Sequence, residues 1–432
     1  MNYSETIDYL FASLPTFQRD GATAYKPGLE RISDFCRRIG NPQRNYFVIH
    51  VAGTNGKGSV CSMLAAVLQQ AGYQTGLFTS PHLHDFRERI RVNGEMISKQ
   101  KVVNFVNKHK TEMEECGLSF FEMTAAMAFD YFAQCDVEVA VIETGLGGRL
   151  DATNIVLPVV SVITNVGLDH TDLLGDSLPK IAREKGGIIK KCVPVIVGEK
   201  NPAYNLVLEE IAADKRSEVI YAEEVFRFDN NGYADGLQVV NVTRVRDEHP
   251  YSLRIDLLGD YQYHNVAVVC TVADYLHEKT PLTISRRALV EGLRTASEMT
   301  SFKGRWQVLG HEPLVVCDTG HNAHGIAHVA EQLSRRTNSG RLYCVMGFCA
   351  DKSIDEMLSL LPTDAHYIFT RADMRRAAKP EDVAAMAERA GLTCEVAPSV
   401  VEAVARAKDM MKTEDMLFIG GSTFVVAEAL AE

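Results

Sequence analysis

The order of apolar and polar residues in the first part of the chain predicts buried strands that alternate with helices. The apolar run Tyr46–Ala52 has the length and content of a strand buried on both faces, and Ser59–Ala71 carries apolar residues at helical spacing. Similar patterns predict strands at Gln74–Thr79, Val137–Glu143, Val159–Val166 and Val193–Val197, and helices at Ser98–Glu114, Phe121–Ala133, Ser177–Lys190 and Ala203–Asp214. This alternation implies an α/β domain whose mostly parallel sheet is covered by helices on both faces.

A different pattern begins near Val225. Short stretches of alternating polarity continue to Leu258, and turn signals occur at Asp229–Gly232 and at Asp235-Gly236. This pattern predicts a small antiparallel β segment attached to the edge of the first domain. Two helices are predicted after it, at Gln262–His277 and Ser285–Thr295.

The alternation of strands and helices starts again after a short polar stretch at Ala296–Gly304, where we place the linker between two domains. Residues 1–297 are expected to form the first domain, and residues 298–432 a smaller Rossmann-like α/β domain. Its strands are predicted at Pro313–Asp318, Arg341–Gly347, His366–Thr370, Cys394–Ala397 and Met416–Gly420, and its helices at Gly325–Ser334, Ser353–Leu361, Pro380–Ala390, Val400–Met411 and Phe424–Ala431.

Charge and composition exclude several classes of protein. The formal net charge of −11 argues against binding to nucleic acid or to an anionic membrane, and no apolar run approaches the roughly 20 residues that span a membrane. The segment Met1–Leu14 contains acidic residues where a signal peptide would have basic ones. The ten cysteines include no CxxC pair and no regular spacing, which suits a protein whose thiols stay reduced. We therefore expect a cytoplasmic protein, and a monomer.

The glycine-rich turn Gly53–Ser59 (GTNGKGS) lies between the first predicted strand and the first predicted helix, which is the context of a phosphate-binding loop. Its three glycines let backbone N–H groups approach phosphate oxygens, and the N-terminus of the following helix favours negative charge. Lys57 can neutralise the β- and γ-phosphates, and the Ser59 hydroxyl can reach Mg²⁺.

The turn departs in two ways from the usual phosphate-loop pattern. Val51 stands where the first glycine would be, and Gly58 separates the lysine from the hydroxyl residue. The alternative interpretation is a glycine-rich turn that binds no ligand. With the loop included, the predicted fold is a three-layer P-loop domain with a parallel sheet and a small antiparallel segment, followed by the Rossmann-like domain.

Polar residues follow other strands of the predicted sheet. Glu143 ends one strand, where α/β proteins bind ligands, and a carboxylate there suits Mg²⁺; the alternative is a solvated strand-end carboxylate. His170 follows the next strand, and it is equally a loop histidine beside Asp169, which would cap the next turn. Lys185 lies on a predicted helix, where a lysine is usually solvated.

The first strand of the second domain ends in a similar polar group. Asp318 is followed by His321 and Asn322 before a helix, which suits contacts to ribose or phosphate. Arg305 follows the linker and can reach phosphates. A salt bridge within the linker is the alternative interpretation for this arginine.

Taken together, these segments resemble the folylpolyglutamate synthase and dihydrofolate synthase family, a branch of the muramyl-ligase superfamily. The resemblance extends over nearly the whole chain, and the extra glycine Gly58 is itself typical of the folate branch. The segments that carry it are Phe17–Gly21, Gly40–Pro42, His50–Ser59, Thr79–Leu83, Gly145–Asn154, Gly167–Thr171, Glu184–Ile188 and Gly420–Ser422.

The resemblance implies roles that the residue patterns leave open. It implies ATP and Mg²⁺ as cofactors, with two ions, and Lys185 matches the lysine that family members carry as a carbamate. The implied metal ligands are Ser59, Ser80, Glu143, His170 and Lys185, and the implied catalytic residues are Lys57, His170 and Lys185. The implied ATP contacts are Thr54, Asn55, Gly56, Lys57, Gly58, Ser59, Asn265, Arg305, Asp318 and His321. The implied pterin or folate contacts are Ser119, Phe120, Phe121, Glu122, Leu150, Asp151 and Ala152.

Two segments depart from the family pattern. The chain reads Asp318–Ala323 (DTGHNA) where family members commonly read Asp-Gly-Ala-His-Asn-Pro, and Glu184-Lys185-Gly186 where Glu-Lys-Ala is commoner. Both departures keep the side chains to which the resemblance gives a role. The first departure affects the local backbone geometry around residues 319–323.

The resemblance implies an ATP-dependent ligase that adds L-glutamate to dihydropteroate, to reduced folates, or to both, through an acyl phosphate. A muramyl-type ligase acting on a nucleotide-sugar peptide is the second hypothesis. A non-catalytic nucleotide-binding module is the third, although such a module has no need of Glu143, His170, Lys185 and Asp318 together.

The phosphate-loop hypothesis predicts that Lys57→Ala abolishes ATP-dependent incorporation of glutamate, because the charge on the transferred phosphoryl group loses the lysine ammonium that would stabilise it. Incorporation of labelled glutamate into the product measures this loss. Near-normal turnover by the variant would contradict the assignment of the loop to the nucleotide.

Overall fold

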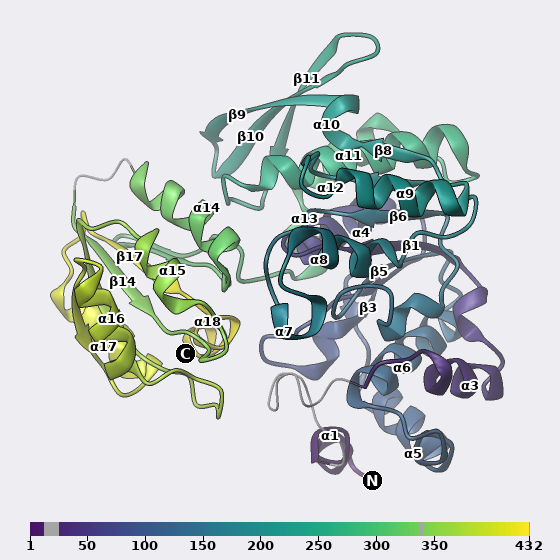
Figure 1. Ribbon diagram of the computed structural model, residues 1–432, viewed down its shortest axis with the longest axis horizontal. Coiled ribbons are helices and arrows are strands. Elements are labelled where there is room, and N and C mark those ends of the chain that lie inside the picture. The colour runs from purple at the N-terminus through teal and green to yellow at the C-terminus, as the bar shows by residue number, and fades with distance from the viewer. Residues whose placement is uncertain (13–25, 337–339, 432) are drawn as a thin grey trace. The chain divides into compact units, whose positions relative to one another are not determined.

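The computed structural model describes residues 1–12, 26–336 and 340–431, and within them the chain forms two compact units (Figure 1). Unit 1 comprises Met1–Asp256 and Gln262–Phe302, and unit 2 comprises Leu257–Tyr261 and Lys303–Glu432. The chain therefore passes from one unit to the other three times. The resemblance segment Phe17–Gly21 lies outside the described residues.

Unit 1 is built on an eight-stranded sheet with the order β4-β3-β2-β5-β1-β6-β7-β8. Strands β2, β5, β1, β6, β7 and β8 pair in parallel, and the short strands β3 and β4 add an antiparallel edge. The strands are β1 (Phe47–Ala52), β2 (Thr75–Phe78), β3 (Ile90–Val92), β4 (Glu95–Met96), β5 (Val139–Glu143), β6 (Val160–Ile163), β7 (Val195–Val197) and β8 (Val219–Tyr221).

Helices cover both faces of this sheet. Ala140 and Ile142 of β5 join the core that contains α6, whereas the side chain of Glu143, which points the other way, lies close to the first turn of α4. The alternation of side chains along a strand therefore puts α4 and α6 on opposite faces. The helices of unit 1 are α1 (Tyr3–Ala12), α3 (Glu30–Arg38), α4 (Lys57–Gln70), α5 (Lys99–Cys116), α6 (Phe120–Gln134), α7 (Thr171–Leu174), α8 (Leu178–Gly186), α9 (Asn205–Lys215), α10 (Ala222–Val225), α11 (Gln262–Lys279), α12 (Arg286–Arg294) and α13 (Ala296–Thr300), with 3₁₀ turns η2 (Pro42–Arg44), η3 (Phe86–Arg89) and η4 (Ala152–Ile155).

The segment predicted as antiparallel forms a separate three-stranded sheet of that kind. Its strands are β9 (Phe226–Ala234), β10 (Leu237–Arg244) and β11 (His249–Ile255), in the order β11-β10-β9. Val240, Val242 and Leu253 are fully buried and give the sheet one apolar face. Helices α11 and α12 pack against this sheet.

Unit 2 is a smaller α/β unit with the sheet order β12-β13-β17-β14-β15-β16. All neighbours pair in parallel except β12, which runs antiparallel to β13. Its elements are β12 (Gln307–His311), β13 (Leu314–Cys317), α14 (Ala323–Ser334), β14 (Leu342–Met346), α15 (Ile354–Ser359), β15 (Ala365–Phe369), α16 (Pro380–Arg389), β16 (Thr393–Val396), α17 (Val400–Met410), β17 (Met416–Gly420) and α18 (Thr423–Leu430). The predicted fold class is confirmed for both units.

The linker region differs from its prediction. The stretch expected to be an open linker from residue 296 begins with the short helix α13, which packs against α4 as part of unit 1. The expected boundary after residue 297 thus falls inside a helix, and the chain enters unit 2 at Lys303. The assignment of Leu257–Tyr261 to unit 2 was not predicted, because five residues carry no periodicity that reveals a distant neighbour.

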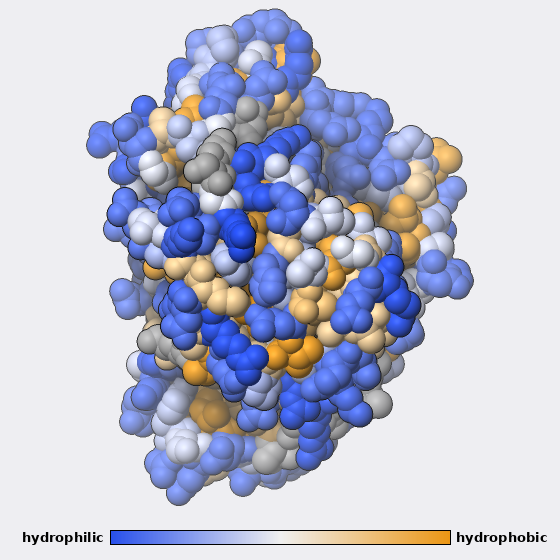
Figure 2. Space-filling view, turned by 90° about the vertical axis from the view of Figure 1, so that its left-hand side faces the viewer, coloured by the Kyte–Doolittle hydropathy of each residue, from blue (hydrophilic) through white to orange (hydrophobic). Residues whose placement is uncertain are grey.

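The surface agrees with a composition in which 23% of residues are charged. Hydrophilic side chains cover most of the face drawn in Figure 2, with smaller apolar areas between them. Among the described helices, none is long and apolar enough to cross a lipid bilayer. All ten cysteines are free thiols.

The close packing of α12 on α4 generates a stability prediction. A Cβ added at Gly292 would lie 2.5 Å from Cα of Val67, so we expect Gly292→Ala to lower the free energy of unfolding by about 1–3 kcal/mol. The sign is informative because alanine favours an isolated helix over glycine by about 1 kcal/mol. Urea unfolding measures the change.

Arg287→Ala is the matched control, since Arg287 is an exposed residue of the same helix. Its effect is expected to stay within about 0.5 kcal/mol. An increase in stability for Gly292→Ala would show that the two helix backbones are not in close contact.

Candidate functional site

Four neighbouring strands of unit 1 end in the segments that were predicted to carry chemistry. In the sheet order β2-β5-β1-β6, β2 leads to Ser80, β5 ends at Glu143, β1 leads to the loop Gly53–Ser59, and β6 leads to His170. Because these strands are parallel, their carboxyl ends share one edge of the sheet. The strand order also reverses at β1, which is where open α/β sheets bind ligands.

The glycine loop is held by the segment that follows β6. Thr54 N donates to Asn165 O at 3.1 Å, and Asn55 N donates to the Asn165 side chain at 3.0 Å. The Thr54 hydroxyl donates to Gly167 O at 3.1 Å and accepts from Gly167 N at 2.9 Å. Two residues predicted to bind ATP are therefore fixed by the loop that also carries His170.

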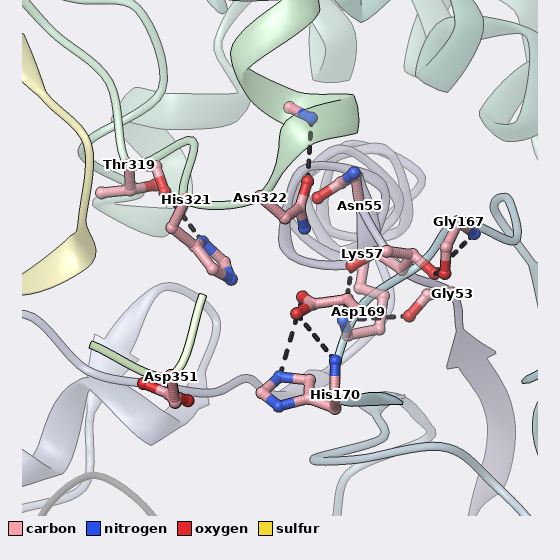
Figure 3. Close-up of polar contacts among 12 residues, drawn as sticks. Gly53, Asn55, Lys57, Gly167, Asp169, His170, Thr319, His321, Asn322 and Asp351 are labelled. Carbon is pink, nitrogen blue, oxygen red and sulfur yellow. Dashed lines mark hydrogen bonds and ion pairs between the residues drawn. The ribbon is translucent and has the colours of Figure 1, made fainter. Parts of the chain in front are cut away.

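Lys57 folds back over the loop that it follows (Figure 3). Its Nζ donates to Gly53 O at 3.1 Å and to Thr54 O at 3.2 Å. These two carbonyl oxygens hold the ammonium group beside the path of the glycine loop. The residue is thus at the loop itself, as its proposed contact with phosphate requires.

Helix α11 brings a second group of polar side chains to the loop. Gln262 Nε2 lies 3.2 Å from the buried Ser59 hydroxyl, and Asn265 Nδ2 donates to Gln262 Oε1 at 2.7 Å. A Cβ added at Gly56 would lie 2.3 Å from Asn265 Oδ1, so glycine is required there by close approach and by its positive φ. The predicted ATP residues Gly56, Ser59 and Asn265 are therefore neighbours.

The extra glycine of the loop faces an aromatic ring. A Cβ on Gly58 would lie 3.1 Å from the nearest atom of the Phe302 ring and 3.8 Å from Glu143 Oε2. Gly58 has ordinary helical backbone geometry, so the neighbouring ring, and not the backbone, disfavours a side chain at this position.

Ser80 and Glu143 meet at the strand ends. Ser80 N donates to Glu143 Oε2 at 3.0 Å, and the carboxylate is 3% exposed. Within the described residues, no group of three or more His, Cys, Asp and Glu side chains is arranged to hold a metal. The donors present near the loop are a carboxylate and serine hydroxyls, and oxygen ligands of this kind suit Mg²⁺, which completes its shell with phosphate oxygens and water.

His170 is held in a strained local conformation. It precedes α7 in the left-handed region, with φ 50°, and its N–H donates to Asp169 Oδ1 at 2.9 Å (Figure 3). The Nε2 atom of the ring lies 3.7 Å from Asp169 Oδ2. Asp169 therefore does not cap α7, whose N-cap residue is His170 without a side-chain cap, and its carboxylate instead lies beside both the backbone N–H and the ring of His170.

Lys185 is not a solvated helical lysine. It is only 2% exposed, and this burial, together with the nearby Lys57 ammonium, lowers the pKa of Lys185 to about 7, while Asp169 acts in the opposite direction. A neutral amine is the form that can add carbon dioxide, so the environment fits the carbamate that the resemblance implies. The surface interpretation from its helical position is wrong, because helical periodicity does not reveal what packs on that face.

The departure at Gly186 has a packing explanation. A Cβ at this position would lie 2.7 Å from Ile211 Cδ1 and 3.3 Å from Leu208 Cδ2. Side chains of α9 therefore fill the space that the commoner alanine would occupy. Gly186 and Lys185 both belong to the buried face of α8.

The first predicted folate segment forms the start of α6. Ser119 caps the helix, accepting from Glu122 N at 3.3 Å, while Glu122 Oε2 accepts from Ser119 N at 2.7 Å. Glu122 also pairs with Arg31 at 3.2 Å and is buried. Both polar side chains thus hold the helix N-terminus.

The aromatic residues of this segment face different neighbours. The Phe120 ring lies 4.9 Å from Phe11 and 6.0 Å from Phe86, measured between ring centres. Phe121 covers Gly145, where an added Cβ would lie 2.4 Å from its ring. Phe121 therefore connects the first predicted folate segment with the loop that contains the second.

The second predicted folate segment lies in the loop 145–154. Leu150 is half-buried and Ala152 is buried. Asp151 is 3% exposed, and its carboxylate accepts from Leu146 N at 2.8 Å and from Thr153 N at 3.0 Å. Burial raises the pKa of Asp151, and these hydrogen bonds act in the opposite direction.

In unit 2, Asp318 organises the carboxyl end of β13. Its Oδ2 accepts from the Tyr261 hydroxyl at 2.5 Å and from Trp306 N at 2.8 Å, and its Oδ1 accepts from Gly320 N at 2.7 Å. The carboxylate is 2% exposed. Asp318 thus holds three parts of unit 2 together, including the segment Leu257–Tyr261.

The other predicted residues of unit 2 lie in the same region. His321 Nδ1 lies 3.0 Å from Thr319 O, and Asn322 Oδ1 accepts from Gly325 N at 2.8 Å and caps α14 (Figure 3). Arg305 is half-buried and follows Gly304, whose carbonyl accepts from Thr319 N at 2.9 Å. The segment 319–323, which differs in sequence from the common family pattern, is therefore held by hydrogen bonds at Thr319 and at Asn322.

Three neighbours of the site were missed in the sequence analysis. Gln262 contacts Ser59, Phe302 covers Gly58, and Thr153 contacts Asp151. Gln262 precedes Asn265 by one helical turn, so this spacing was an available signal. Phe302 and Thr153 give no comparable signal in one sequence.

The buried lysine generates a prediction for the pH dependence of stability. Between pH 7 and 10.5 the unfolded chain binds a proton at Lys185 that the folded chain does not bind, so stability rises with pH across this window. Relative to Lys185→Met, the wild-type protein is expected to gain roughly 2 kcal/mol between pH 7 and pH 9. Urea unfolding of both proteins in buffer free of carbon dioxide measures it. A difference between the two that does not change with pH would contradict a depressed pKa.

Two family models match the chain. The Mur ligase middle domain matches residues 51–273, and the glutamate ligase domain of Mur ligases matches residues 304–423. The two matches fall mainly in unit 1 and unit 2, respectively.

Curated relatives include two kinds of protein. A Bacillus subtilis dihydrofolate synthase/folylpolyglutamate synthase is 36% identical, over 83% of this chain and 84% of the relative. A probable bifunctional folylpolyglutamate synthase/dihydropteroate synthase of Haloferax volcanii is 35% identical over 99% of this chain. The chain spans about half the length of that haloarchaeal relative.

Solved structures of similar proteins share the fold. Escherichia coli FolC in complex with DHPP and ADP has a TM-score of 0.85 at 28% identity, covering 100% of this chain and 97% of that one. A bifunctional folylpolyglutamate synthase/dihydrofolate synthase with Mn, AMPPNP and L-glutamate bound also has a TM-score of 0.85 at 28% identity. This match covers 100% of this chain and 98% of that one. On this evidence the chain belongs to the folylpolyglutamate synthase/dihydrofolate synthase family of ATP-dependent glutamate ligases, which is built from Mur ligase domains.

Proposed function

We propose that this protein joins L-glutamate to dihydropteroate and to reduced folates, acting as both dihydrofolate synthase and folylpolyglutamate synthase. One observation carries the proposal. The phosphate loop, the Ser80–Glu143 pair and the Phe121–Gly145 contact occur at the ends of adjacent strands of one sheet. In this arrangement a phosphate, a metal and a flat ring system could bind at neighbouring positions.

ATP is the proposed nucleotide. The glycine loop, with Lys57 at its centre, suits the phosphates, and Asn265 adjoins the loop at Gly56. The family resemblance also assigns ATP contacts to Arg305, Asp318 and His321. The binding of AMPPNP and of ADP by two similar proteins supports the choice of nucleotide.

A divalent metal is the proposed partner of these phosphates, and Mg²⁺ is the proposed ion. Ser59, Ser80 and Glu143 would hold one ion, and His170 with carbamylated Lys185 would hold a second. A similar protein binds Mn, which supports a divalent metal. The metal would withdraw negative charge from the phosphate oxygens.

The pterin is proposed to lie near Phe121 and the loop 145–154. Phe121 and Ala152 are apolar, whereas Asp151 supplies the only carboxylate of that loop. An aromatic ring and a buried carboxylate are the groups that recognise a fused heterocycle with an amino group. The DHPP complex of a similar protein supports this class of substrate.

The proposed reaction activates a carboxylate before the amide forms. A carboxylate oxygen of the substrate attacks the γ-phosphorus of ATP, the bond to ADP breaks, and an acyl phosphate results. The amine of glutamate then attacks the acyl carbon, phosphate leaves with the electron pair of its C–O bond, and the amine loses a proton. Lys57 at the glycine loop is the proposed cation that stabilises charge on the transferred group, and the family resemblance assigns Arg305 to the same role.

A muramyl-type ligase remains the second candidate, because both matching domain models describe Mur ligases. The identity with folate ligases over most of the chain favours the first candidate. A non-catalytic module is disfavoured by the buried Lys185, which has no purpose in nucleotide binding alone. The monomeric state and the cytoplasmic location stay predictions.

The test supplies purified protein with ATP, Mg²⁺, L-glutamate and one acceptor at a time. We expect ADP release with dihydropteroate and with tetrahydrofolate, and mass spectrometry should find glutamate added to each. A UDP-muramyl peptide is expected to give no ADP. Turnover with the nucleotide sugar alone would move the assignment to the muramyl-type ligases.

A further inference from the structure

A buried polar chain connects the central strand of unit 1 with the proposed folate loop. His50 lies on β1 and Thr153 lies in η4, and both are completely buried. His50 Nε2 is 2.8 Å from the Thr153 hydroxyl oxygen, and that hydroxyl donates to Asp151 Oδ1 at 2.5 Å. The three side chains thus form one continuous chain of hydrogen bonds.

The donor and the acceptor of each hydrogen bond follow from the single hydrogen that the Thr153 hydroxyl carries. The Thr153 hydroxyl has one hydrogen, and the Asp151 carboxylate accepts it. The hydroxyl can therefore only accept from His50, which must carry its proton on Nε2. Burial keeps this imidazole neutral by lowering the pKa of His50 to about 3, so Nδ1 carries no proton.

The Nδ1 atom of His50 shows that packing alone does not explain the residue. This atom is buried and has no hydrogen-bond partner among the described residues. An unsatisfied buried acceptor lowers stability, and an apolar side chain in the core would avoid this cost. The contact that distinguishes histidine from an apolar residue here is the one to Thr153.

The hydrogen bonds between these three side chains affect the shape of the loop 145–154. Thr153 gives both its hydroxyl and its N–H to Asp151 Oδ1, and Leu146 N donates to Oδ2 at 2.8 Å. Asp151 thereby ties the start of the loop to its end. The loop contains Leu150 and Ala152, and its first residue, Gly145, lies under Phe121.

We propose that His50 and Thr153 are positioning residues that hold Asp151, and with it this loop, in the shape that the pteridine ring of the substrate requires. The proposal rests on the proposed function. It assigns the pair to the folate side of the site, although His50 lies only three positions before the phosphate loop in the sequence. A purely structural role would disturb the nucleotide and the folate alike.

Two pairs of variants test the proposal. Thr153→Val removes the hydroxyl with little change of shape, whereas Thr153→Ser keeps it. His50→Leu removes the donor, whereas His50→Gln keeps an N–H of similar reach. Thr271→Val is the matched control, because Thr271 is also buried and its hydroxyl donates only to a carbonyl of its own helix, Ala267 O at 2.9 Å.

Calorimetry measures the dissociation constant for dihydropteroate. Steady-state kinetics measures the KM for dihydropteroate and the KM for ATP. We expect Thr153→Val to raise the dissociation constant and the KM for dihydropteroate about tenfold, as for a lost hydrogen bond to a charged group. His50→Leu removes a hydrogen bond to a neutral hydroxyl, and we expect it to raise both values by roughly threefold to tenfold. The KM for ATP should change less than about twofold. Thr153→Ser, His50→Gln and Thr271→Val should stay near wild type, with thermal unfolding as the check on folding.

The outcomes separate this inference from the proposed function. If wild-type protein binds neither dihydropteroate nor tetrahydrofolate, the proposed function fails, and the inference fails with it. If wild type binds dihydropteroate and Thr153→Val binds it equally well, the inference alone is overturned. Equal losses for ATP and dihydropteroate, or failure of Thr153→Ser to restore binding, would assign the pair a general structural role and would also overturn it.

Discussion

Close approach of the backbone between the ends of strands β1 and β6 is the constraint on which the site depends. A Cβ on Gly53 would lie 1.8 Å from the Thr164 hydroxyl, which instead donates to Asn55 O at 2.6 Å. Only glycine fits this space. The contact sets the path of the glycine loop Gly53–Ser59, and this path determines where Lys57 begins the following helix.

Charge within unit 1 imposes the second constraint. Lys57 and Lys185 lie close enough to influence one another, and Lys185 is almost completely buried. Two ammonium groups in this setting would repel and would be poorly solvated, so the folded state favours the neutral amine at Lys185. The proposed carbamate would replace that repulsion with attraction, because it places a negative group beside Lys57.

Contacts with residues distant in the sequence explain why two positions near the site are glycines. Gly58 lies against Phe302, and Gly186 lies against Ile211. In each case the neighbour occupies the volume of the missing side chain. The departures from the usual patterns at these glycines are therefore features of packing, and they leave the chemistry of Lys57 and Lys185 in place.

Local patterns in the sequence predict the alternation of strands and helices, the glycine loop and most candidate residues, because these depend on periodicity and on residues adjacent in the chain. Packing between distant segments is what replaces part of the expected linker with α13 and buries Lys185. It also brings His50 to Thr153 across roughly a hundred intervening residues. Contacts between distant segments leave no local pattern, since they arise only when the sheet brings its strand ends together.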